Sequence, residues 1–113
     1  MSKKILIGGE WREAAESFAV ENPFTNEQIA EVFSIDGDEL EEVISAAEIG
    51  AKEMRKLARF EIAKGLREIA GQIEKRKKEF AETIALESAK PINLALSEVE
   101  RGISTFNLAA GEA

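Results

Sequence analysis

The first 35 residues alternate short apolar runs with turn residues, a pattern typical of β-strands. The run Ile5-Leu6-Ile7 is followed by Gly8-Gly9, a pair that readily adopts the positive φ of a tight turn, and the chain returns at Glu10-Trp11, which predicts a hairpin. A second run ends at Asn22-Pro23, because proline lacks the N–H that a central strand needs. A turn and a further strand over residues 29–35 follow.

From Asp36 onward the apolar period becomes helical. Asp36 and Glu39 have the spacing of a capping box that opens a helix. A second apolar stripe has a break near residues 75–78 that would divide it into two helices, and Pro91 suits the first turn of a last helix. We therefore expect an α+β, mostly helical fold, with short strands over 1–35 and three to four packed amphipathic helices over 36–113, in a single partial domain of residues 1–113.

Composition removes whole classes of chemistry. The chain has no cysteine and no histidine, so it can form no thiolate nucleophile, Ser-His pair, zinc finger or disulfide. Hydrophobic residues make up 44% of the 113, but many are alanine, so the core should be thin. No apolar run near the N-terminus is long enough for a signal peptide or a membrane span, which predicts a cytoplasmic protein without a membrane partner.

The charged clusters favour structural roles over binding. The chain carries a net charge of -7, and its basic cluster over residues 75–78 is flanked by Glu74 and Glu79 with no interleaved aromatic side chain. We interpret that cluster as a solvated helix face and expect no nucleic-acid partner. The acidic run that begins at Asp36 lacks the ligand spacing of a calcium loop.

No catalytic or cofactor-binding residue can be named from these residues alone. Gly8-Gly9 lacks the G-x-G-x-x-G spacing of a phosphate-binding loop. Trp11 is expected to close the hairpin against the helices, and Glu98 and Arg101 are spaced to pair on a helix surface.

The motifs taken in order resemble the opening of the aldehyde dehydrogenase superfamily. The resemblance covers essentially the whole chain, with two departures: Ala89 stands where the family usually has glycine, and Met54 stands near a common tryptophan. The matching motifs are Ile7-Gly8-Gly9-Glu10-Trp11, Phe18-x-Val20-x-Asn22-Pro23-x-Thr25-x-Glu27, Ile69-Ala70-x-x-Ile73-Glu74-x-Arg76, Glu87-x-x-Lys90-Pro91 and Glu98-Val99-Glu100-Arg101.

The resemblance implies an enzyme whose main parts come later in the polypeptide. Family members oxidise an aldehyde to the carboxylic acid by thiolate attack, hydride transfer to NAD or NADP, and hydrolysis of the thioester. Their catalytic cysteine, general-base glutamate and nucleotide-binding core follow the segment that this chain resembles. The chain is therefore expected to be an N-terminal fragment that is inactive alone and binds no cofactor by itself.

The resemblance also implies two sites. Arg101 stands where members similar to non-phosphorylating glyceraldehyde-3-phosphate dehydrogenases have an arginine at the substrate channel, which suggests an anionic or hydroxylated aldehyde; a surface ion pair with Glu98 is the alternative. Lactaldehyde-type members have a similar Glu-Val-Glu-Arg stretch. Some members hold a monovalent cation at places that correspond to Val20, Glu21 and Glu87.

Two other functions stay open at this point. A chain whose helix faces lack a sheet to cover could be a stand-alone binding module that associates with itself or another chain. A carboxylate-based hydrolase has only the abundant glutamate in its support. The expected partners are the remainder of a dehydrogenase polypeptide or a second copy of the chain.

Overall fold

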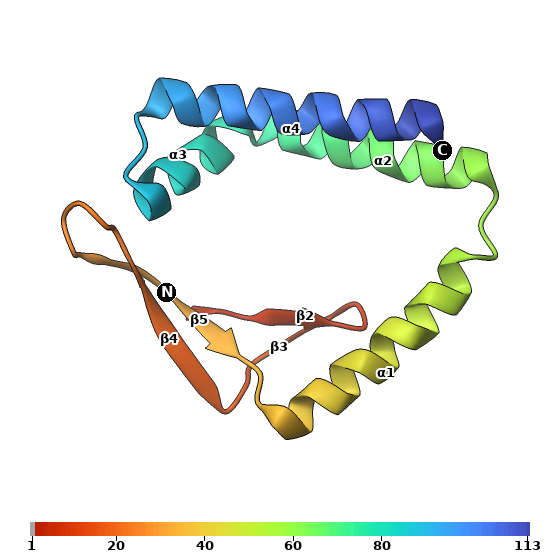
Figure 1. Cartoon of the computed structure of the whole chain (residues 1–113), viewed down its shortest axis with the longest axis horizontal. Helices are drawn as coiled ribbons and strands as arrows, with labels where there is room; N and C mark the ends of the chain where they lie inside the picture. The colour runs from red at the N-terminus through yellow and green to blue at the C-terminus, as the bar shows by residue number, and fades with distance from the viewer. Residues whose placement is uncertain (1) are drawn as a thin grey trace. The chain divides into compact units, whose positions relative to one another are not determined.

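The computed structural model describes residues 2–113, which fall into two compact units, one ending at Lys56 and the other spanning Leu57–Ala113 (Figure 1). The first unit holds all the strands and one helix, and the second holds three helices. No helix in residues 2–113 is both long and apolar enough to cross a membrane. The elements are β1 (Ser2–Lys3), β2 (Ile5–Ile7), β3 (Glu10–Arg12), β4 (Glu16–Glu21), β5 (Gln28–Ser34), α1 (Gly37–Met54), α2 (Arg59–Lys75), α3 (Lys77–Ser88) and α4 (Ile92–Glu112).

The predicted hairpin is confirmed as β2 and β3. The strands pair antiparallel with Ile7 opposite Glu10, so Gly8 and Gly9 alone form the turn, with φ values of 58° and 88°. Positive φ at both central residues is the conformation that glycine adopts without steric cost. A Cβ added at Gly8 would lie 3.6 Å from the Cβ of Ala46 on α1, so the helix passes close to the turn.

The other strands form a three-stranded sheet in the order β1-β5-β4. The Asn22-Pro23 turn joins β4 to β5, as the sequence indicates. The Oδ1 atom of Asn22 accepts hydrogen bonds from the backbone N–H groups of Phe24 and Thr25, and Asn26 has a φ of 58°. Asparagine tolerates this left-handed conformation better than most residues, so the turn is specified locally.

Helix α1 begins at the predicted capping box. The carboxylate of Asp36 accepts from the N–H groups of Asp38 and Glu39, and the Glu39 side chain accepts from the N–H of Asp36. A 2.8 Å ion pair between Arg12 and Glu42 links β3 to this helix within the first unit.

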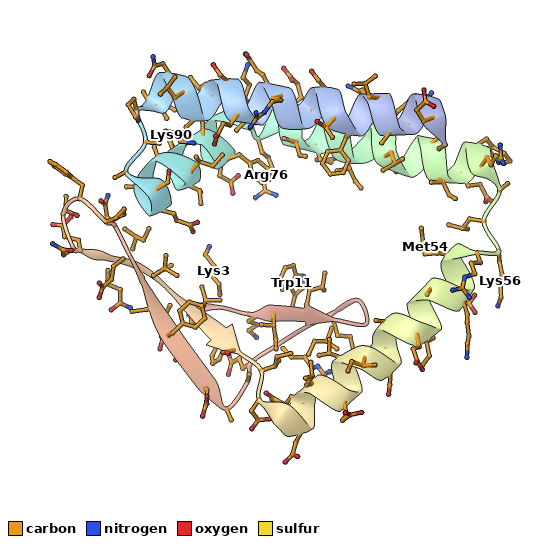
Figure 2. The ribbon with its side chains drawn as sticks, in the orientation of Figure 1. Lys3, Trp11, Met54, Lys56, Arg76 and Lys90 are labelled. Atoms are coloured by element: carbon orange, nitrogen blue, oxygen red, sulfur yellow. The ribbon has the colours of Figure 1, made fainter. Side chains whose placement is uncertain are left out.

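Trp11 differs from its expected packing. Its side chain is 66% exposed, and its cross-strand partner Leu6 is 56% exposed (Figure 2). Directly paired residues of a two-stranded hairpin lie on the same face, and in the described part of the first unit nothing covers that face enough to bury them. The expectation that Trp11 closes the hairpin against the helices is therefore wrong for α1, the helix of its own unit.

In the second unit, α4 packs along both α2 and α3 (Figure 1). The predicted break near residues 75–78 is confirmed at Arg76, which separates α2 from α3. Pro91 is the N-cap of α4, one position before the predicted first turn. The residues that are 0% exposed, Ala81 and Ala95, have small side chains. This confirms the prediction of a thin core.

The α+β, mostly helical fold class is confirmed. Helix α1, however, belongs to the same unit as the strands rather than to a bundle with α2, α3 and α4. The single domain over residues 1–113 stays a prediction for the complete protein.

Candidate functional site

A shallow pocket of about 320 Å³ lies along the first turns of α4 and contains Arg101. Residues at positions 94, 97, 98 and 101 lie on one face of a helix because they are three or four apart. Lys90 precedes the helix and completes the pocket, whose lining is Lys90, Leu94, Ser97, Glu98 and Arg101.

The turn between α3 and α4, which contains Lys90, has a strained backbone at Ala89. Ala89 ends α3 with φ 52° and ψ 30°, the left-handed conformation that glycine usually occupies at a helix C-terminus. The chain then passes Lys90 and enters α4 at Pro91. Lys90 is therefore positioned between two helix ends rather than on a helix face (Figure 2).

Charge pairing inside the pocket differs from the pairing predicted along the helix. Lys90 Nζ donates a 2.5 Å hydrogen bond to Glu98 Oε1, and both side chains are about one-third exposed. This bond, aided by the charge of Arg101, lowers the pKa of Glu98 below its ordinary value. Glu98 is thus bonded to Lys90, whereas Arg101 acts on it through its charge. The substrate role of Arg101 stays a prediction at this point.

The residues of the predicted cation site lie in both units. Val20 and Glu21 end β4 where the register against β5 shifts, and Glu87 is in the last turn of α3. No group of three acidic, histidine or cysteine side chains in residues 2–113 is arranged to hold a metal ion. The predicted monovalent-cation site uses main-chain oxygens rather than such side chains, so the site at Val20, Glu21 and Glu87 stays a prediction.

The Gly8-Gly9 pair does not fit the phosphates of NAD or NADP. The Gly8-Gly9 pair closes a hairpin and is followed by β3, so no helix N-terminus with free N–H groups follows it, as a phosphate-binding loop requires. Gly8-Gly9 therefore does not form the phosphate-binding loop of a nucleotide site.

A second hollow, which the sequence analysis missed, lies along α2 and the start of α3. We call it the α2–α3 groove; it has a volume of about 490 Å³ and is lined by Gly65, Glu68, Ile69, Gln72, Ile73, Arg76 and Phe80. The guanidinium of Arg76 lies 5.3 Å from the centre of the Phe80 ring, an arrangement typical of a cation–π contact. The sequence contained a signal for this groove. Gly65 lies one helical turn before Ile69, and because glycine has no side chain it leaves space beside the apolar Ile69.

The fold and pocket can now be compared with known proteins. The model of the aldehyde dehydrogenase family matches residues 11–113. The chain belongs to the aldehyde dehydrogenase family, whose members are oxidoreductases, and this confirms the resemblance found in the sequence.

Two curated relatives and one solved structure illustrate the match. The lactaldehyde dehydrogenase of Methanocaldococcus jannaschii is 37% identical over 106 residues, which cover 94% of this chain and 23% of that protein. The 3-sulfolactaldehyde dehydrogenase of Priestia aryabhattai is 31% identical over 110 residues, 96% of this chain and 22% of that protein. The NADP-dependent glyceraldehyde-3-phosphate dehydrogenase of Bacillus halodurans, solved with NADP, superposes with a TM-score of 0.95 at 26% identity, over 99% of this chain and 24% of that one.

The chain therefore spans about a quarter of the length of the relatives that it matches. It is similar to one segment of an NAD(P)-dependent aldehyde dehydrogenase. The sequence contains no cysteine, so it offers no thiolate nucleophile.

Proposed function

We propose that the chain is the N-terminal part of an NAD(P)-dependent aldehyde dehydrogenase that oxidises an anionic or hydroxylated aldehyde to its acid, and that it is inactive alone. The observation that carries the proposal is the pocket on α4, whose lining includes Arg101, Lys90 and Ser97. The chain that holds this pocket belongs to the aldehyde dehydrogenase family. The nucleophile, the general base and the nucleotide site would come from the remainder of the polypeptide. A cytoplasmic location is part of the same proposal.

Arg101 would bind the polar end of the substrate. A guanidinium presents parallel N–H donors that match the two oxygens of a carboxylate, sulfonate or phosphate. The names of the relatives agree with such a role, since they include a sulfonated aldehyde, a phosphorylated one and a hydroxylated one. The cation site at Val20, Glu21 and Glu87 is a further part of the proposal.

The proposed partner is the remainder of the dehydrogenase polypeptide, which would cover the α2–α3 groove. This groove is apolar along Ile69, Ile73 and Phe80, and large apolar side chains elsewhere on the second unit are exposed, such as Phe60 at 73%. Exposed apolar surface of this kind usually belongs to an interface. This chain matches only 23% of the Methanocaldococcus jannaschii relative, so about three-quarters of that polypeptide lies outside the match and would supply the occupant.

The experiment is reconstitution of activity from two polypeptides. The purified chain is mixed with a polypeptide that contains the Methanocaldococcus jannaschii lactaldehyde dehydrogenase without its matching segment, and NAD(P) reduction is followed with lactaldehyde. We expect activity from the mixture and none from either component. Aldehyde-dependent reduction by the chain alone would disprove the claim of inactivity.

A matched pair of variants tests the groove. Ile69→Gln places a polar side chain on the apolar surface of the groove. Arg67→Gln introduces the same residue, glutamine, at an exposed position of α2 outside the groove. Reconstitution should weaken with Ile69→Gln and stay unchanged with Arg67→Gln. Equal effects would remove the groove from the proposal.

The second candidate function is a stand-alone module that associates with itself, and the same exposed apolar side chains favour it. Sedimentation of the isolated chain distinguishes the two. A stable dimer that Ile69→Gln dissociates, together with no binding to the remainder of the enzyme, would favour the module.

A further inference from the structure

The pocket on α4 contains three charged side chains whose sum is one positive charge. Lys90 and Arg101 are cationic and Glu98 is anionic. The hydrogen bond from Lys90 holds the Glu98 carboxylate against the pocket lining. The Glu98 carboxylate is ionised at neutral pH, as a glutamate of ordinary pKa is, and the hydrogen bond from Lys90 lowers its pKa further.

We propose that Glu98 is a specificity-determining residue, which reduces the preference of this pocket for doubly charged phosphate esters relative to singly charged carboxylates and sulfonates. The inference rests on the proposed role of Arg101 as the group that binds the anionic end of the substrate. Lys90 is the positioning residue, because it holds the Glu98 carboxylate within the pocket.

The effect of Glu98 on specificity follows from the net charge of the pocket and the charge of the substrate's anionic group. A phosphate ester carries between about 1.5 and 2 negative charges at neutral pH, whereas a carboxylate or sulfonate carries one. The Glu98 carboxylate repels both in proportion to their charge, and Lys90 offers less attraction because it is already bonded to Glu98. The Glu98 carboxylate therefore weakens the binding of a dianion more than that of a monoanion.

Coulomb's law gives the size of the effect. At about 5 Å in a water-like dielectric, removal of one negative charge should strengthen binding about fourfold for a monoanion and about sixteenfold for a dianion. The ratio of the two affinities should therefore move about fourfold toward phosphate when Glu98 loses its charge.

The experiment titrates the chain with two probes, methanesulfonate and inorganic phosphate at about pH 8, at constant ionic strength. NMR shifts of the backbone amides of Ser97 and Arg101 report binding. The variant Glu98→Gln should move the affinity ratio toward phosphate by about fourfold. The control Glu100→Gln makes the same change in total charge at a residue that pairs with Lys77 outside the pocket, and it should leave the ratio unchanged.

A second variant keeps the test decisive if Glu98→Gln fails to fold. Lys90→Gln removes a positive charge from the same pocket, so it should weaken phosphate binding more than methanesulfonate binding and move the ratio the opposite way. A ratio that stays constant in whichever of these two variants folds would overturn the role of Glu98.

The variant Arg101→Gln separates this inference from the proposed function. If Arg101→Gln weakens both probes while the Glu98 and Lys90 variants leave the ratio constant, only the specificity role fails. If Arg101→Gln leaves both affinities unchanged, the proposed substrate role of Arg101 fails and the inference fails with it.

Discussion

Ala89→Gly should stabilise the second unit, because Ala89 adopts a conformation that suits glycine. Its φ of 52° and ψ of 30° lie in the left-handed region, and this residue ends α3 immediately before Lys90. An L-residue with a Cβ pays about 1–2 kcal/mol in that region. Glycine avoids this cost but loses more backbone freedom on folding, about 0.5–1 kcal/mol. The net gain in the free energy of unfolding is therefore about 0.5–1 kcal/mol.

Thermal and urea unfolding followed by circular dichroism measure this gain. A change of about 1 kcal/mol raises the Tm of a domain of 60–100 residues by about 4–8 °C. The matched control is Ala85→Gly in the same helix, where the backbone is α-helical and the side chain packs against the core cluster. That control should lose about 1 kcal/mol. An Ala89→Gly protein that is less stable than the parent would refute the assignment of strain to this turn.

Three further predictions concern caps, pH and packing. Asp36→Ala removes the capping box and should destabilise α1 by about 0.5–2 kcal/mol, seen as faster amide hydrogen exchange in its first turn, whereas unchanged exchange would contradict the cap. The pKa of Glu98 is lowered in the folded state by Lys90, so the stabilisation from this pair is complete above the ordinary carboxyl pKa of about 4.3 and is lost as pH falls through the lower folded value. The difference in urea midpoint between the parent and Glu98→Gln should accordingly shrink in acid, and a difference that grows there would contradict the pair. Ala95→Leu places three more carbons at a position that is 0% exposed and should cost about 1–3 kcal/mol in urea unfolding; a more stable variant would show that the core has room.

Local signals predicted the parts of the fold that depend on neighbours in sequence. The Gly8-Gly9 turn, the Asp36 capping box and the break before α3 each follow from residues within four positions of one another. The fold class follows from the change of apolar period at residue 36.

Contacts set by tertiary geometry were not predictable in this way. Lys90 precedes the start of α4, so helical spacing could not show that it reaches Glu98, and the i, i+3 rule pointed to Arg101 instead. The exposure of Trp11 was also unpredictable, because an apolar strand residue is normally taken to be covered.

The residues of this segment contain no signal for thiolate or nucleotide chemistry. Cysteine and histidine are absent, and no described glycine pair precedes a helix N-terminus as in a nucleotide-binding loop. The pocket at Arg101 is lined by residues of this segment, and its role in substrate binding is the part of the proposed function that the segment itself can test.

The most direct test of this account uses a chimera in which the chain replaces the matching segment of the Methanocaldococcus jannaschii lactaldehyde dehydrogenase. Steady-state kinetics are compared for the chimera and its Arg101→Gln variant, with neutral lactaldehyde and with an aldehyde that bears a carboxylate. Loss of a charge-assisted hydrogen bond should lower kcat/KM for the carboxylate substrate by about 10- to 100-fold, mainly through KM, and leave lactaldehyde much less affected. Equal kcat/KM values for the parent chimera and the variant on the anionic aldehyde would contradict the assignment of this pocket to the substrate.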